Sequence, residues 1–266
     1  TTLRLKVNAQ PTDALSIGLS VWHSGSKYGA PSIARDDDTI TATQPEPTDI
    51  HYDTYGFKIG YDFQPFSVSS IASYLDYGSK NHFDISPVGP LLGVTFPEGP
   101  DFPPLEYNVL AAKVFSEEIN LISRQQGPWH WTAGASYRDA KDQLLQQFIG
   151  VGNEDQSTSF AVFGELSRKF FSDRLEWTAG ARYFHDDEST TDLLPPPGVP
   201  VDHFTASFHA ATPRLVLSWY PRSNLTAYAS YSQGFRSGFG QQPVILEAAP
   251  QFPPVKPDKL HNYEIG

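Results

Sequence analysis

The connections between the predicted strands of this chain alternate between two lengths. Alternating apolar and polar residues predict about eleven strands, of which the first two cover Leu3 to Ala9 and Leu15 to Val21. Every odd-to-even connection is a tight turn of about four or five residues, and every even-to-odd connection is a longer loop. A sandwich or a propeller has no reason to gather its long loops at one end, whereas a transmembrane barrel does. The pattern therefore predicts an all-β fold, an antiparallel up-and-down transmembrane β-barrel, of which this chain forms a partial wall.

The positions of glycine, proline and charge set the remaining boundaries. We expect long loops at Gly25 to His51, Ser79 to Lys113, Gln143 to Ser157, from Asp186 onward, and Ser237 to Lys259. The other predicted strands are 52–63, 68–78, 115–121, 129–137, 160–170, 175–183, 215–219, 225–236 and a half-strand ending at 266. All but one of the 23 prolines fall in these loops or in the turns. The exception is Pro213, which we expect at a bulge or at the outer end of its strand.

The stretch from Ser223 to Arg236 separates its residues into two faces most clearly. Leu225, Ala227, Ala229 and Tyr231 share one side, and Thr226, Tyr228, Ser230 and Ser232 share the other. One side suits lipid and the other suits a wet lumen. On 68–78 the faces are less distinct, and the preferred assignment sets Ile71, Leu75 and Tyr77 against Ser70, Ala72 and Asp76.

The same alternation predicts which side chains face outward. We expect an outward aliphatic set of Leu3, Leu5, Leu15, Leu19, Trp177, Ala179, Leu217 and Leu225, and an inward basic set of Arg4, Lys6, Arg182 and Arg214. Aromatic residues near strand ends are predicted to form interfacial girdles: Trp22, Tyr77, Tyr137, Tyr183, Trp219 and Tyr231. The alternative for these aromatics is the core of a β-sandwich.

Composition excludes several functions. The formal net charge is -11, so the chain lacks the clustered Lys and Arg of a nucleic-acid groove. It has no cysteine, which excludes disulfides, thiol catalysis and cysteine-ligated zinc. No run approaches about 18 consecutive apolar residues, so a helical membrane span is not predicted.

Motifs for catalysis or metal binding are missing. Gly234 to Gly238 holds Ser237 at the wrong spacing for a nucleophile elbow, and no two histidines have ligand spacing. The acidic runs Asp36 to Asp38 and Asp186 to Glu188 fit solvated loops better than cation sites. We therefore predict no enzyme activity, no catalytic or metal-binding residue and no cofactor. Loop aromatics are candidate ligand contacts, with packing of the loops on themselves as the alternative: Phe96, Phe102, Tyr107, Phe239 and Phe252.

Two pieces near the end of the chain resemble the barrel of TonB-dependent outer-membrane receptors. They are Tyr228-Ala-Ser-Tyr-Ser-Gln-Gly-Phe-Arg236 and Pro257-Asp-Lys-Leu-His-Asn-Tyr-Glu-Ile-Gly266. Phe115 to Leu121, Phe160 to Ser167 and Leu175 to Tyr183 resemble other stretches of these barrels. Asp258-Lys259 departs from the family, which more often has Glu followed by a small or polar residue.

The resemblance implies a location, a fold and a function. Such receptors lie in the bacterial outer membrane as barrels of about twenty-two strands, filled by an N-terminal plug. Uptake is energised through TonB, and the ligand is a scarce nutrient, most often a ferric siderophore, with haem, cobalamin or oligosaccharides as alternatives. We expect residues 1–266 to be an internal part of the barrel domain, with lipid, the TonB complex and a small ligand as partners. The plug and the remaining strands would lie outside this chain.

Two other functions remain open from the sequence. A passive porin or autotransporter barrel shares the alternation, and the resemblance at Tyr228 to Gly266 separates it from a receptor. A soluble secreted β-protein that binds or cleaves glycans is the third hypothesis.

Overall fold

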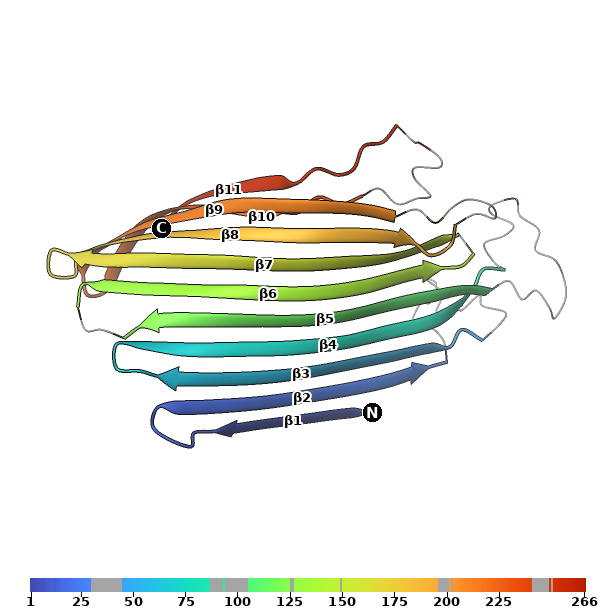
Figure 1. Ribbon diagram of the computed structural model, residues 1–266, viewed down its shortest axis with the longest axis horizontal. Helices are drawn as coiled ribbons and strands as arrows, with labels where there is room; N and C mark the ends of the chain where they lie inside the picture. Colours follow the sequence, from blue (N-terminus) through green and yellow to red (C-terminus); the bar gives the residue numbers. More distant parts are fainter. Residues whose placement is uncertain are drawn as a thin grey trace.

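The computed structural model describes residues 1–29, 45–86, 93, 105–124, 127–148, 150–195, 201, 203–240, 249 and 251–266. These residues form one antiparallel sheet of eleven strands, which pair in the order in which they occur in the sequence (Figure 1). No helix of the described residues is long and apolar enough to cross a bilayer. The strands are β1 (Thr2–Ala9), β2 (Leu15–Tyr28), β3 (Thr48–Asp62), β4 (Phe66–Asp84), β5 (Leu105–Ser123), β6 (Trp129–Gln146), β7 (Val151–Phe170), β8 (Leu175–Asp192), β9 (His203–Arg222), β10 (Leu225–Arg236) and β11 (Asp258–Ile265).

The tight turns gather at one end of the sheet and the other connections at the opposite end, as predicted (Figure 1). We call these the turn end and the loop end. One predicted long loop is wrong, because β6 runs to Gln146 and β7 starts at Val151, so only residues 147–150 connect them. The ladder between these strands closes on the pair Gln146 and Val151.

Several strands also extend further toward the loop end than predicted. The run Asp186 to Glu188 lies inside β8 instead of opening a loop, and β9 begins at His203, well before Leu215. Strand β5 likewise begins at Leu105. On β8 both faces carry polar residues beyond Tyr183, which removes the period-2 signal while the backbone ladder continues. His203 to Ala210 of β9 still alternate polar and apolar residues, but with the phase reversed relative to the belt.

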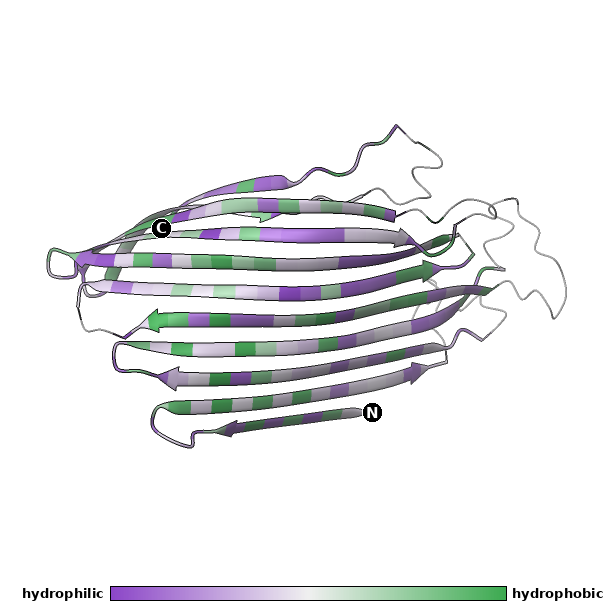
Figure 2. Ribbon diagram, viewed as in Figure 1, coloured by the Kyte–Doolittle hydropathy of each residue, from purple (hydrophilic) through white to green (hydrophobic). Residues whose placement is uncertain are grey.

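The register assigns residues to two faces. Leu5 pairs with Val21, Leu19 pairs with Phe57, and Trp177 pairs with Leu217, so the aliphatic residues line up from strand to strand. We call this the apolar face. The opposite, polar face carries Arg4, Lys6, Lys58, Glu165, Arg182 and Arg214. Figure 2 shows the resulting bands of hydrophobic and hydrophilic residues along the strands.

Side-chain exposure identifies the apolar face as the convex one. On β7, Phe160 and Val162 of the apolar face are 46% and 51% exposed, whereas Ser159 and Ala161 of the polar face are 7% and 1% exposed. Side chains crowd on the concave side of a curved sheet, so even a small alanine is covered there. The polar face therefore lines the inside of the partial barrel, as in a transmembrane barrel.

One predicted phase is wrong. Lys58 pairs with Ile71, which places Ile71 on the polar face together with Leu75 and Tyr77. The apolar face of β4 instead carries Val68, Ala72 and Tyr74. The mixed composition of this strand did not distinguish its two faces.

Two rows of aromatic side chains border the aliphatic belt on the apolar face. The loop-side row consists of cross-strand ring pairs, with centroids 5.1 to 6.4 Å apart: Tyr55 with Tyr74, Phe115 with Tyr137, Phe160 with Tyr183, and Tyr231 with Tyr263. The turn-side row includes Tyr61, Phe66, Trp129, Trp131, Trp177 and Trp219. From Phe160 to Phe170, β7 rises about 33 Å, which a tilt of about 40° reduces to about 25 Å. That height matches the hydrocarbon band of an outer-membrane barrel.

Four of the six predicted girdle residues lie in the two aromatic rows, and the prediction is wrong for the other two. Tyr137, Tyr183, Trp219 and Tyr231 lie in the two rows. Trp22 instead pairs with Arg4 on the polar face, and its ring packs edge-on against Tyr52. Tyr77 pairs with Tyr52 on the same polar face.

Pro213 lies in the interior of β9, so its predicted position at a bulge or strand end is wrong. It pairs with Ala181 in an unbroken ladder with β8. The ladder between β9 and β10 ends one residue away, at Arg214 and Ser232. The sheet therefore forks at Pro213, and the loop-side half of β9 has no strand partner on its β10 side among the described residues.

Candidate functional site

The polar face is the candidate functional surface, and its middle section carries both charges. Arg214 of β9 forms an ion pair with Glu165 of β7, and Arg182 of β8 donates a hydrogen bond to Ser136 at 3.5 Å. Gly180 pairs with both Glu165 and Arg214, so the ion pair passes over a residue without a side chain. Glu165, Arg182 and Arg214 line a cavity of about 310 Å³. The predicted inward direction of Arg182 and Arg214 agrees with this register.

The loop-end section of the polar face is acidic. Asp142 and Asp155 are direct cross-strand partners, and like charges in that arrangement repel each other. Burial and then the charge of Asp155 raise the pKa of Asp142, while Arg138 acts in the opposite direction. No group of three or more His, Asp or Glu side chains in the described residues is placed to hold a metal ion. These carboxylates make the inner wall negative near its mouth.

Asp186 and Glu188 continue this acidic section on β8, beyond the loop-side row. The carboxylate of Asp186 is buried and accepts hydrogen bonds from Ser157 and Ser237, each at 2.8 Å. Burial, together with a hydrogen bond and the charge of Asp186, raises the pKa of Glu188 to about 7. Glu188 therefore keeps its proton over part of the pH range in which an ordinary glutamate is ionised.

The residues after β10 lie against this acidic section. The ring centroids of Phe235 and Phe184 lie 6.0 Å apart, and the hydroxyl of Ser237 donates a hydrogen bond to Asp186. Phe239 forms a two-bond bridge with Val255, and a Cβ at Gly240 would meet the ring of Phe204 at 2.6 Å. Beyond the fork, the end of β10 has thus turned inward over β8 and β9. No sequence signal had marked this contact.

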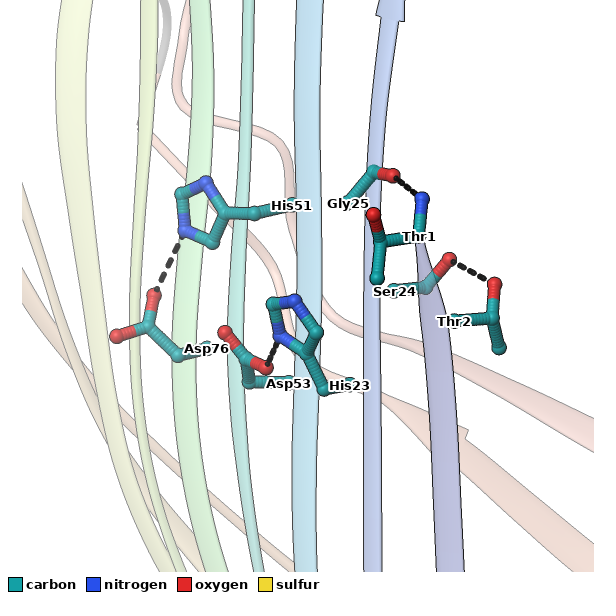
Figure 3. A network of polar contacts seen from close by, with 8 residues as sticks. All are labelled: Thr1, Thr2, His23, Ser24, Gly25, His51, Asp53 and Asp76. Atoms are coloured by element: carbon teal, nitrogen blue, oxygen red, sulfur yellow. Dashed lines mark hydrogen bonds and ion pairs between the residues drawn. The ribbon is translucent and has the colours of Figure 1, made fainter.

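The apolar face becomes polar beyond the loop-side row. His23 lies 2.5 Å from Asp53, and His51 lies 3.4 Å from Asp76, as Figure 3 shows. Lys113 approaches Asp76 at 3.7 Å. The histidines thus pair with single carboxylates, across strands, and this band of ion pairs suits water or headgroups beyond the aliphatic belt.

The remaining predicted site residues have different positions. Phe96, Phe102 and the run Asp36 to Asp38 lie outside the described residues. Tyr107 packs on His82 on the apolar face, so it does not face the interior. Phe239 and Phe252 are both about half exposed near the loop end.

The chain matches a known protein family. The model of the TonB dependent receptor-like β-barrel matches residues 3–266. The chain belongs to the TonB-dependent receptor β-barrel family. No curated protein matches it by sequence.

Solved structures of two receptors and a copper transporter share the fold at low identity. The siderophore receptor PiuA from Acinetobacter baumannii aligns with a TM-score of 0.71 at 11% identity, covering 100% of this chain and 46% of PiuA. The ferric-catecholate import receptor Fiu from E. coli K12 aligns with a TM-score of 0.71 at 12% identity, covering 100% of this chain and 48% of Fiu. The copper transporter OprC aligns with a TM-score of 0.67 at 12% identity, covering 99% and 42%. The chain thus spans less than half the length of these receptors.

Proposed function

We propose that this chain is part of the barrel wall of an outer-membrane receptor that takes up a scarce nutrient through a plugged barrel, with TonB supplying the energy. The two-faced sheet is the observation that carries the barrel-wall part of the proposal, and the family match over residues 3–266 supports the receptor part. Its apolar face has an aliphatic belt of membrane height between two aromatic rows, and its concave face is polar and charged. A soluble glycan-binding β-protein has no use for such a belt.

The proposed cargo is a metal chelate of the ferric siderophore type. Family membership and the cargo named for PiuA and Fiu support this class. The cargo named for OprC is copper, so a different metal is the second candidate. The acidic mouth at Asp142, Asp155, Asp186 and Glu188 favours a chelate of low negative charge, because an anionic one would be repelled there.

The plug and the remaining strands stay a prediction. Strands β1 and β11 pair on one side only, so the sheet does not close on itself. Further strands of the same receptor would satisfy both edges, and the interior would then hold the plug.

Uptake by cells tests the proposal. We expect deletion of the gene to abolish uptake of at least one radiolabelled ferric siderophore from a set containing a catecholate, a hydroxamate and ferric citrate. Uptake should also stop in a strain without TonB, with the receptor still in the membrane. Uptake that persists without TonB would instead support a passive barrel. Copper uptake that depends on the gene, without any siderophore uptake, would select the second cargo.

A further inference from the structure

Arg168 of β7 holds an unusual position on the apolar face. Its cross-strand partners are Trp129 and Trp177, so it lies within the turn-side aromatic row. Its guanidinium carbon is 4.7 Å from the ring centroid of Trp129 and 4.6 Å from that of Phe170. Among the described residues of β1 to β9 it is the only arginine on this face. The lysines of that face lie beyond the loop-side row, at Lys27, Lys80, Lys113 and Lys141.

Among the described residues, no group accepts a hydrogen bond from the guanidinium of Arg168. Its Nε atom is buried without a hydrogen-bond partner, and the ion pairs of the described residues do not include it. The nearest carboxylates along the strands, Glu165 and Glu176, lie on the polar face and interact with Arg214 and Tyr220. Two aromatic rings stabilise the charge, yet a guanidinium has five N–H donors that rings cannot satisfy. An acceptor from outside the described chain would complete this site.

We propose that Arg168 binds the phosphate of a phospholipid headgroup in the leaflet at the turn end. This inference rests on the proposed membrane location. A planar guanidinium matches two phosphate oxygens, and its aliphatic stem can lie along the belt while the charged end reaches the headgroup level. Trp129 and Trp177 stand at the same level, where indole rings are stable and can flank the first carbons of the acyl chains.

The next turn supports this depth. Phe171 has a positive φ of 53°, a left-handed conformation that is rare for a bulky residue. Phe171 is 76% exposed, and its ring centroid lies 6.4 Å from that of Phe170. An exposed aromatic ring next to Phe170, the ring that Arg168 contacts, fits the interface between hydrocarbon and headgroups. A free phosphate ion would leave these rings without a partner, so the lipid is the better occupant.

Native mass spectrometry of the intact receptor in detergent tests the site, with palmitoyl-oleoyl phosphatidylglycerol as the probe. We expect Arg168→Gln to weaken binding of the tightest lipid about tenfold, the typical effect of losing one charge-assisted contact. Arg182→Gln is the matched control, because Arg182 also lies near two rings, Phe163 and Phe184, at 5.9 and 5.8 Å, but on the polar face. It should bind the lipid as the unchanged receptor does. Equal weakening in both variants would overturn the proposal.

Two further experiments distinguish a lipid site from a free-anion site and from a variant that fails to fold. Excess inorganic phosphate should not displace the lipid, and displacement that depends on Arg168 would show a free-anion site instead. If Arg168→Gln fails to fold, the unchanged receptor can be labelled with a phosphatidylglycerol that carries a photoreactive headgroup. Labels within residues 127–131 or 166–177 are expected, and labels only elsewhere would refute the site.

A receptor that inserts into membranes and transports its cargo but shows no effect of Arg168 refutes only the lipid site. Absence from the membrane would refute the proposed function.

Discussion

Glu165 on β7 and Arg214 on β9 form an ion pair that spans the intervening strand above Gly180. Both side chains are roughly half exposed, so water screens the pair and its net contribution to stability is small. We expect Glu165→Gln to lower the free energy of unfolding by less than about 1 kcal/mol. Urea titration of the receptor refolded in lipid vesicles measures this change. A loss of several kcal/mol would mean that Glu165 also interacts with something outside the described residues.

The aliphatic belt predicts that an introduced charge has very different effects on stability at two adjacent positions of β9. Leu217 lies on the apolar face, paired with Trp177, while Val216 lies on the polar face, paired with Thr178. Leu217→Arg should cost about 2 to 4 kcal/mol in a bilayer, because a charge would face hydrocarbon. Val216→Arg is the control and should cost much less, since its charge would enter a wet interior. Similar losses for the two variants in the same vesicles would contradict the assigned faces.

Two glycines on neighbouring strands should tolerate a methyl group very differently. A Cβ at Gly134 would lie 2.4 Å from the ring of Phe163 and 2.7 Å from the carbonyl oxygen of Ile119. At Gly164 the nearest atom would be the carbonyl oxygen of Thr132, at an ordinary 3.6 Å. We expect Gly134→Ala to destabilise the receptor by about 1 to 3 kcal/mol through overpacking. Gly164→Ala should leave the stability almost unchanged. Thermal unfolding of both variants, monitored by gel mobility, measures the difference.

Glu188 should make stability depend on pH near neutrality. Its pKa is raised to about 7, so between the ordinary value of 4.5 and about 7 the folded protein holds a proton that the unfolded chain has released. Stability should therefore fall as pH rises through that window. Urea midpoints at pH 5 and pH 8 measure the effect. In Glu188→Gln the urea midpoints at pH 5 and pH 8 should lie closer together. An unchanged difference between these midpoints would assign the proton to another group.

The two edges predict the behaviour of the isolated chain. Every residue of β1 and β11 is exposed, and each strand has one unpaired edge. Unpaired edges beside an aliphatic belt promote association. Residues 1–266 expressed alone should aggregate in water and be soluble only in detergent, as sedimentation would report. A detergent-free monomer with sharp, reversible unfolding would argue against the membrane-wall interpretation.

The sequence predicted the belt well and the loop end poorly, for one physical reason. Within the belt, Leu217 and Val216 differ in environment, and the alternation of residue types follows that difference. Beyond the loop-side row both faces meet water, so Glu154 and Gln156 on one face resemble Asp155 and Ser157 on the other. The contact between Ser237 and Asp186 arises from the fork at Pro213, a tertiary feature that no local pattern encodes.

The short connection at residues 147–150 has a consequence for the mouth of the barrel. Strands β6 and β7 remain hydrogen-bonded up to Gln146 and Val151, so this section of the rim is built like the wall below it. To move this section of the rim, the hydrogen bonds of the ladder would have to break one after another from the tip. The section is therefore rigid. This section of the mouth is expected to keep its shape while the ladder between β6 and β7 stays intact.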